Sequence, residues 1–119
     1  MANPSDVGPS GAGTEVLRRW YDSTVDSSSE TVMINGVADH IYTVLSVVAF
    51  NPNAACVFHI RFYAEGTGSE MTLVKADIPQ NGTFVFSDKI VIAGADELRV
   101  LTATTDDIIV HCTYIDQEF

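Results

Sequence analysis

The sequence predicts an all-β protein: a single antiparallel β-sandwich, jelly-roll-like, with an extended N-terminal arm. Two observations support this prediction. Apolar residues alternate with other residues over short runs, and turn-forming residues separate these runs about every ten residues. In the run Val57–Tyr63, for example, every second residue is Phe or Ile. A period of two places one set of side chains against a core and the other set outside. An open barrel is the alternative arrangement of such strands.

The chain of 119 residues is long enough for one domain with its own core. A hydrophobic fraction of 46% excludes global disorder. The longest apolar run, Ile41–Phe50, contains Thr43 and Ser46 and is much shorter than the ~20 residues of a membrane span. The first residues show no basic start followed by an apolar stretch, so we expect no secretory signal.

We expect residues 1–22 to form the arm and residues 23–119 the sandwich. Met1–Gly13 is rich in Gly, Pro and Ser, a composition typical of extended segments. Glu15–Tyr21 is either one or two helical turns or a first strand, and it is too short for a stable isolated helix. Ser23–Glu30 is a second polar link before the sandwich.

Eight strands are expected in the sandwich, and turn residues separate them. Asn35-Gly36 and Asn81-Gly82 can supply the positive φ angles of tight turns. Asn51–Asn53 and Glu65–Gly68 are expected at loop tips, and Pro79 ends a strand because it cannot donate to the ladder. The expected strands are Thr31–Ile34, Ile41–Asn51, Ala55–Ala64, Glu70–Ala76, Thr83–Phe86, Lys89–Ile92, Glu97–Ala103 and Asp107–Ile115.

Alternation along these strands predicts one core between two sheets. Its expected members are Leu45, Val47, Phe58, Ile60, Phe62, Phe84, Phe86, Leu98, Val100, Val110 and Tyr114. Both cysteines, Cys56 and Cys112, share the inward parity and are expected to be buried thiols. The alternation does not decide whether they lie close enough for a disulfide.

Charge and motifs argue against several classes of function. Sixteen acidic residues against six basic ones give a net charge of −10, which repels phosphate backbones, so we expect no nucleic-acid partner. The chain has no G-x-S-x-G motif and no acidic loop of the calcium-binding pattern. We therefore expect no enzyme, with no catalytic, cofactor-binding or metal-binding residues, and no cofactor.

The chain has three histidines, and none is expected to be a catalytic residue. His40 stands where a loop enters a strand, so it is expected at a strand end and not as a general base. His59 and His111 have outward parity on strands that could be neighbours, as a solvated pair or as a pH-responsive interface. A zinc site from these two histidines with Cys56 and Cys112 is disfavoured, because the histidine and cysteine of each strand face opposite sides.

One cluster is a candidate for binding a partner: Arg18, Arg19, Trp20 and Tyr21. It contains the only adjacent basic pair of an acidic chain, beside two large aromatic residues. Arg, Trp and Tyr are the residue types that dominate interface hot spots. The alternative is that Trp20 and Tyr21 cap the sandwich.

Several sequence runs resemble small structural proteins from the virions of tailed bacteriophages, especially phages of cyanobacteria and other marine bacteria. The runs are Gly13–Arg19, Asp39–Ser46, Thr83–Val91, Asp96–Val100 and Thr113–Gln117. The resemblance implies a capsid decoration (cement) protein on the exterior of the virion that bridges neighbouring shell subunits. It also implies that the major capsid protein or other virion proteins are the partners.

Two other functions stay open at this stage. The first is a tail, neck or baseplate adaptor that contacts other virion proteins or a host receptor. The second is a stand-alone binding module for a small ligand. Exposed sheet edges favour closure with copies of the same chain, and the three-fold positions of an icosahedral shell favour a trimer. No membrane partner is expected.

Overall fold

The computed structural model describes residues 14–119, which fold into nine strands and no helix. The predicted Met1–Gly13 part of the arm lies outside the described residues. The strands are β1 (Thr14–Val25), β2 (Thr31–Asn35), β3 (His40–Asn51), β4 (Cys56–Ala64), β5 (Ser69–Ile78), β6 (Gly82–Phe86), β7 (Ile90–Ala93), β8 (Glu97–Thr102) and β9 (Ile108–Glu118).

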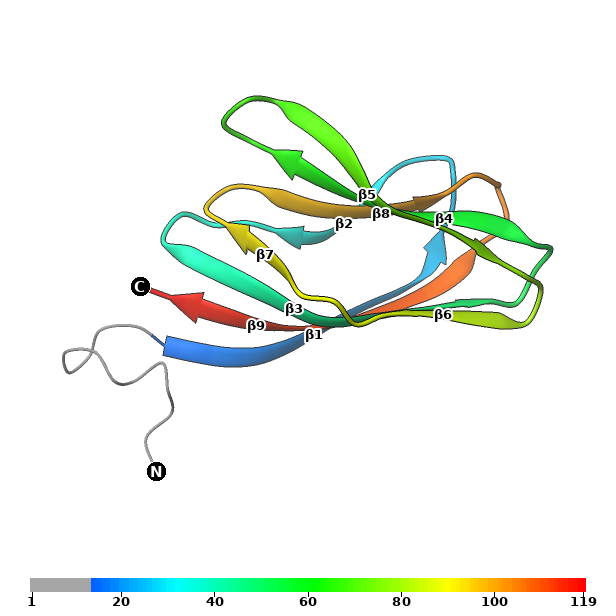
Figure 1. The fold of residues 1–119 in the computed structure, drawn as a ribbon, viewed down its shortest axis with the longest axis horizontal. Helices are drawn as coiled ribbons and strands as arrows, with labels where there is room; N and C mark the ends of the chain where they lie inside the picture. The colour runs from blue at the N-terminus through cyan, green and yellow to red at the C-terminus, as the bar shows by residue number, and fades with distance from the viewer. Residues whose placement is uncertain (1–13) are drawn as a thin grey trace.

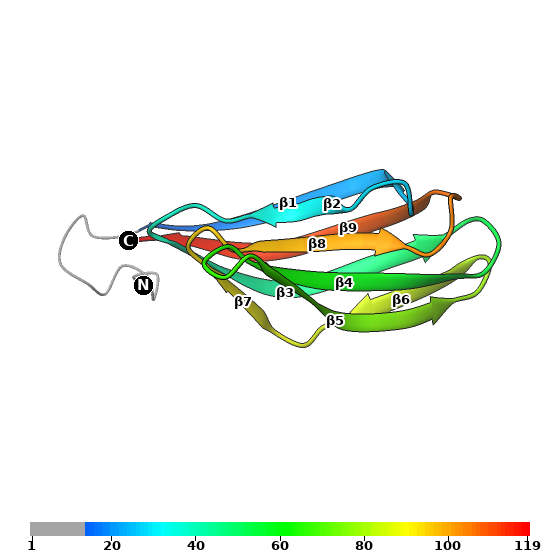
Figure 2. The ribbon, with the colours of Figure 1, turned by 90° about the horizontal axis from the view of Figure 1, so that it is seen from above.

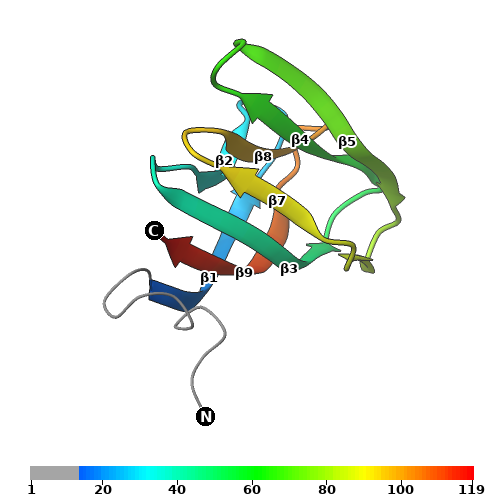
Figure 3. The ribbon, with the colours of Figure 1, turned by 60° about the vertical axis from the view of Figure 1, so that its left-hand side comes forward.

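The strands form two antiparallel sheets packed against each other, so the predicted β-sandwich is confirmed (Figures 1 and 3). Sheet A has the order β1-β9-β3-β6, with β7 also paired to β3, and sheet B has the order β2-β8-β4-β5. Successive strands change sheet, except at the β4–β5 hairpin and from β6 to β7. When β6 and β7 are counted as one interrupted strand, this is the eight-stranded double-sheet arrangement of a jelly roll.

The position of β1 corrects the predicted boundary between arm and sandwich. Thr14–Asp22 pairs residue by residue with β9, from Thr14 opposite Glu118 to Asp22 opposite Val110. These residues therefore belong to sheet A and not to an arm or a hinge, and Glu15–Tyr21 is a strand and not helical turns. Four β-branched residues and two aromatics in Thr14–Val25 suit a strand, and pairing with β9 supplies its backbone partners. Figure 2 shows β1 along the length of the molecule.

The edge of sheet A beside β3 is made by two short strands. β6 pairs with Val47–Asn51 and β7 pairs with Ile41–Val44, so the two strands succeed each other along the same side of β3. The pairing of β3 with β9 shifts between Val44 and Ser46, which leaves Leu45 as the extra residue of a bulge. A bulge reverses the side-chain parity of everything that follows it.

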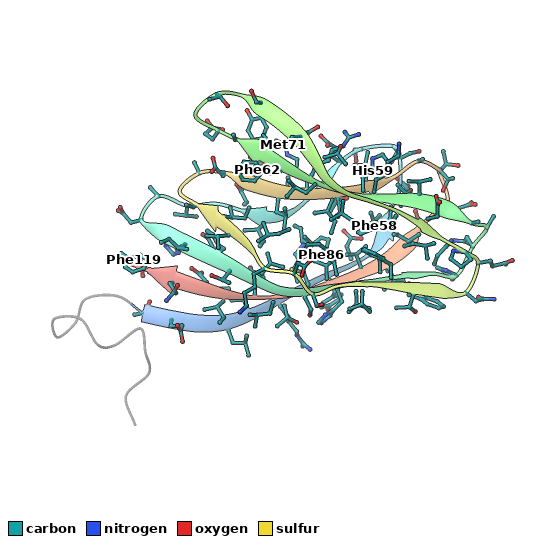
Figure 4. All side chains as sticks on the ribbon, in the orientation of Figure 1. Phe58, His59, Phe62, Met71, Phe86 and Phe119 are labelled. Atoms are coloured by element: carbon teal, nitrogen blue, oxygen red, sulfur yellow. The ribbon has the colours of Figure 1, made fainter. Side chains whose placement is uncertain are left out.

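The bulge explains the one error in the predicted core. Tyr42 and Val44 point inward before it, and Val47 and Ala49 point inward after it, whereas Leu45 is outside the core. Six of the predicted residues are buried: Val47, Phe58, Ile60, Leu98, Val100 and Val110. Four more are half-buried and pack against that core: Phe62, Phe84, Phe86 and Tyr114. In Figure 4, Phe58 lies between the sheets and His59 lies on the other side of β4.

The turn at Asn81 agrees with the prediction, and the connection at Gly36 differs from it. Asn81 adopts a φ of 61°, as a tight turn requires, but Gly36 has no positive φ. Gly36 instead lies against the backbone oxygens of Gly94 and Asp96, where a Cβ would clash, and its N–H donates to Asp96 O at 2.9 Å. The prediction of a positive φ at Asn35-Gly36 is wrong, because the positive φ in the connection from β2 to β3 belongs to Asp39, at 67°.

Asn51 was expected at a loop tip but is fully buried. Its side-chain amide donates to the carbonyls of Ala54 at 2.9 Å and Ile78 at 3.0 Å, and its Oδ1 accepts from Asn53 N at 3.0 Å. A buried amide with all of these partners fixes the β3–β4 loop against the end of β5.

Candidate functional site

The structure separates the predicted partner-binding cluster into two pairs. Arg18 and Trp20 lie opposite Tyr114 and the buried Cys112, so they face inward, and Trp20 packs against the core. Arg19 and Tyr21 lie opposite Thr113 and His111, so they face outward on sheet A. Alternation along a strand makes this separation unavoidable for four consecutive residues. The four side chains do not form one surface.

The outward pair belongs to a larger surface, the outer face of sheet A, which we call the A face. It consists of the outward-facing side chains of β1, β9, β3, β6 and β7. Exposed apolar side chains reach across the whole sheet, with Leu17 and Tyr21 each 68% exposed on one edge and Val85 and Val91 57% and 58% exposed on the other. Ile109 is also exposed, and half-buried residues such as Val48 and Ile115 fill the rows between them.

The A face is nearly free of charge although the chain is strongly acidic. Four acidic residues lie in the strands of sheet A: Glu15, Asp22, Asp116 and Glu118. Only Glu15, opposite Gln117, has outward parity; the pairing places the other three on the inward side. Its outward strand positions carry one cationic side chain that is permanently charged, Arg19. An apolar face of this extent on an acidic protein is typical of a surface that contacts another molecule.

A shallow hollow interrupts the A face between β1 and β9. Its volume is about 360 Å³, and it is lined by Leu17, Arg18, Arg19, His111 and Thr113. Its lining combines one aliphatic side chain with two guanidiniums, an imidazole and a hydroxyl.

The outer face of sheet B, which we call the B face, is built in the opposite way. Arg61 and Arg99 lie directly opposite each other on β4 and β8, and three glutamates surround them. Arg99 contacts Glu70 at 2.9 Å, Glu97 at 2.9 Å and Glu30 at 3.4 Å. Arg61 contacts Glu30 at 3.2 Å and Glu70 at 3.3 Å. These five charged side chains thus pair with one another, although the buried Nε of Arg61 and Nε2 of His59 have no hydrogen-bond partner among the described residues.

Electrostatics on the B face follow from these contacts. Partial burial lowers the pKa of Arg99, but hydrogen bonds to Glu97 and Glu70 outweigh it, so the pKa of Arg99 is raised. Arg99 also stacks over the Tyr63 ring at 4.1 Å from its centroid. Desolvation, and then the charges of Arg61 and Lys75, lower the pKa of His59. His59 is therefore a neutral side chain at neutral pH, beside the cluster that contains Arg61 and Arg99.

A third cluster joins the ends of β1, β3 and β9. Asp116 Oδ2 accepts from Arg18 Nε at 2.8 Å, and Asp116 Oδ1 lies 2.7 Å from His40 Nδ1. The other ring nitrogen of His40 lies 3.5 Å from Glu118. Burial alone would raise the pKa of Asp116, but the hydrogen bonds from His40 and Arg18 outweigh it and lower this pKa.

Both ring nitrogens of His40 thus face carboxylates, and neither is directed at a hydroxyl or thiol nucleophile among the described residues. The arrangement holds three strand ends together. It agrees with the prediction of His40 as a strand-end residue.

The residues of the disfavoured zinc site, two cysteines and two histidines, are divided between the two sheets. Cys56 and His59 are on sheet B, and His111 and Cys112 are on sheet A, so the two histidines are not neighbours. Both cysteines are free and buried, as predicted, and burial raises the pKa of Cys112 to about 12. Within residues 14–119, no group of three His, Cys, Asp or Glu side chains is placed to hold a metal ion. The same residues contain no helix that could span a membrane.

Sequence reasoning did not identify the A face. The sequence did contain one indication of this face. The strands β3, β9, β6 and β7 have no acidic residue at an outward position, although the chain has sixteen acidic residues. This indication became visible only when the pairing put these strands into one sheet.

Comparison with known proteins gives a fold and no family. No protein-family model matches the chain, and no curated protein sequence matches it. Among solved structures, the chain is similar to a subunit of the disulfide-linked pili of Bacillus endospore appendages. The identity is 12%, the TM-score is 0.55, and the match covers 91% of this chain and 90% of the other. At this identity the similarity shows a shared β-sandwich fold.

Two further structures are more distant. An N-terminal fragment of Clostridium thermocellum xylanase 10B, with CBM22-1 and GH10 modules, matches at 14% identity and a TM-score of 0.46. The structure of infectious bursal disease virus, Gx strain, matches at 8% identity and a TM-score of 0.44. This chain spans 26% and 31% of those two chains.

Proposed function

We propose that this chain is a structural protein of a virion, a capsid decoration protein that bridges neighbouring shell subunits. The observation that carries the proposal is the A face, a broad apolar surface on a protein of net charge −10. A rigid sandwich with one apolar and one self-neutralised face is suited to binding other proteins within an assembly. The sequence resemblance to tailed-phage structural proteins supports the choice of a virion.

The chemistry of the described residues favours non-covalent assembly. Cys112 is fully buried and Cys56 is 7% exposed, and they lie on different sheets. The charged clusters on the B face and around Asp116 are paired internally. Among the described residues, the apolar side chains of the A face are therefore the proposed contacts between copies.

Copy number per particle tests the proposal. Purified virions of the phage that encodes the chain are analysed by quantitative mass spectrometry against the major capsid protein. A decoration protein is expected in many copies, in a fixed ratio to the shell protein, and particles that lack it should rupture at lower temperature. A few copies per particle would support the tail, neck or baseplate adaptor instead. Absence from particles would contradict both assignments.

A further inference from the structure

We propose that the partner of the A face is the A face of a second copy of this chain, so that two copies form a face-to-face dimer. The inference rests on the proposed function for taking the A face as a surface of interaction, and it deepens that function: two copies that pair through their A faces, each bound to the shell by its other surfaces, link neighbouring shell subunits. Three properties of the A face support a second copy as the occupant: its area, its charge and its relief.

The area of the A face matches what a stable dimer requires. The two longest strands of sheet A, β1 and β3, each have 12 residues. At about 3.3 Å per residue and about 4.8 Å between strands, four strand positions give a face of roughly 40 by 19 Å. This is roughly 750 Å², close to the ~800 Å² that each partner buries in a standard interface.

The charge of the A face allows two copies of this acidic chain to approach. Two molecules of net charge −10 repel each other over most of their surfaces. The ion cluster of the B face contains two arginines and three glutamates, so its formal charge is −1. The outward strand positions of the A face carry Glu15 and Arg19, one charge of each sign. Its formal charge is therefore zero, and repulsion between copies is smallest there.

The relief of the A face is self-complementary. Tyr21 protrudes from β1, while the adjoining hollow is bounded by Leu17, Arg19, His111 and Thr113. In a face-to-face pair, the protruding aromatic of one copy can fill the hollow of the other, and the reverse contact follows by symmetry. A pair that uses the same surface on both copies has a two-fold axis. The inference therefore predicts a dimer. It differs from the expectation of a trimer, which came from the three-fold positions of an icosahedral shell.

Four single substitutions and the unchanged protein test this inference. Leu17→Glu and Val91→Glu place an acid at opposite edges of the A face, on side chains 68% and 58% exposed. Val32→Glu is the matched control, because it makes the same change on the B face, opposite Arg99. Arg19→Glu adds a variant that removes no packing. Circular dichroism melting checks that each variant is folded.

Sedimentation velocity over a range of concentrations provides the measurement. The unchanged protein should sediment at twice its 12.9 kDa chain mass at micromolar concentration, and this species should persist in high salt. Leu17→Glu, Val91→Glu and Arg19→Glu should each weaken the dimer by about tenfold or more, because each brings uncompensated acids together. Val32→Glu should leave the dimer unchanged.

Several results would overturn the inference. These are a monomer up to about 100 μM, a trimer, a dimer that survives all three A-face variants, or equal dissociation in Val32→Glu. Binding of each variant to particles is measured separately. A monomer found in many copies on particles would reject the dimer and keep the decoration role. A dimer that dissociates as described but is absent from virions would reject that role and keep the dimer.

Discussion

The two outer faces of this sandwich are both formed by antiparallel strands, but they differ in which side chains they present. On the B face, two arginines and three glutamates form ion pairs with one another. On the A face, five large apolar side chains are exposed and the strands carry two formal charges at outward positions. A strand of alternating residues requires only that its inward side be apolar. The A face combines several exposed apolar side chains with few charges, whereas the exposed Val32 of the B face lies beside ion pairs.

The largest expected effect on stability is at β4, whose inner side lies in the core and whose outer side belongs to the B face. Phe58 is fully buried, with its ring 6.1 Å from that of Phe84, so Phe58→Ala should cost ~3–5 kcal/mol in the free energy of unfolding. His59→Ala, on the outer side, should change it by less than about 0.5 kcal/mol. Urea denaturation measures both. Equal losses would mean that the inner and outer sides of β4 are misassigned.

An intermediate effect is expected at the strand ends of sheet A. Asp116→Asn removes the carboxylate that accepts from Arg18 and His40, and should cost ~1–2 kcal/mol at pH 7. Because the folded pKa of Asp116 is lowered, its stabilisation is complete above the unfolded pKa of about 3.9 and is lost as the pH falls through the folded value. The two proteins should therefore converge in acid.

Unfolding curves at several pH values check this prediction. His40→Ala at neutral pH serves as a control that removes one partner and retains the carboxylate. A stability difference that persists in strong acid would show that Asp116→Asn acts through packing and not through charge.

The smallest expected effect is on the B face itself. Arg99→Gln should cost less than about 1 kcal/mol, because the ion pairs are partly solvated and Arg61 remains to bind Glu30 and Glu70. The loss should shrink in 0.5 M salt, where such pairs are screened. Thermal melts at two salt concentrations measure it. A loss of several kcal/mol, independent of salt, would mean that the network is a structural element, and the contrast with the A face would weaken.

Much of the sandwich could be predicted from local pattern alone. The period of two along Val57–Tyr63 placed Phe58 and Ile60 in the core, and the same parity placed both cysteines there. Parity is a local property, because successive side chains of an extended chain point to opposite sides whatever the strand pairs with. The turn at Asn81 was equally local, because few residues other than Gly tolerate its positive φ.

Other features were decided by the tertiary structure. Leu45 left the core because β3 carries a bulge where its partner on one edge changes from β7 to β6. Residues 14–22 became a strand because β9 was available to pair with them, and His59 and His111 lie on different sheets because of the jelly-roll crossings. The A face exists only once five strands from across the chain lie in one sheet. Strand pairing depends on contacts between residues that are distant in sequence, so the local alternation of side chains does not determine it.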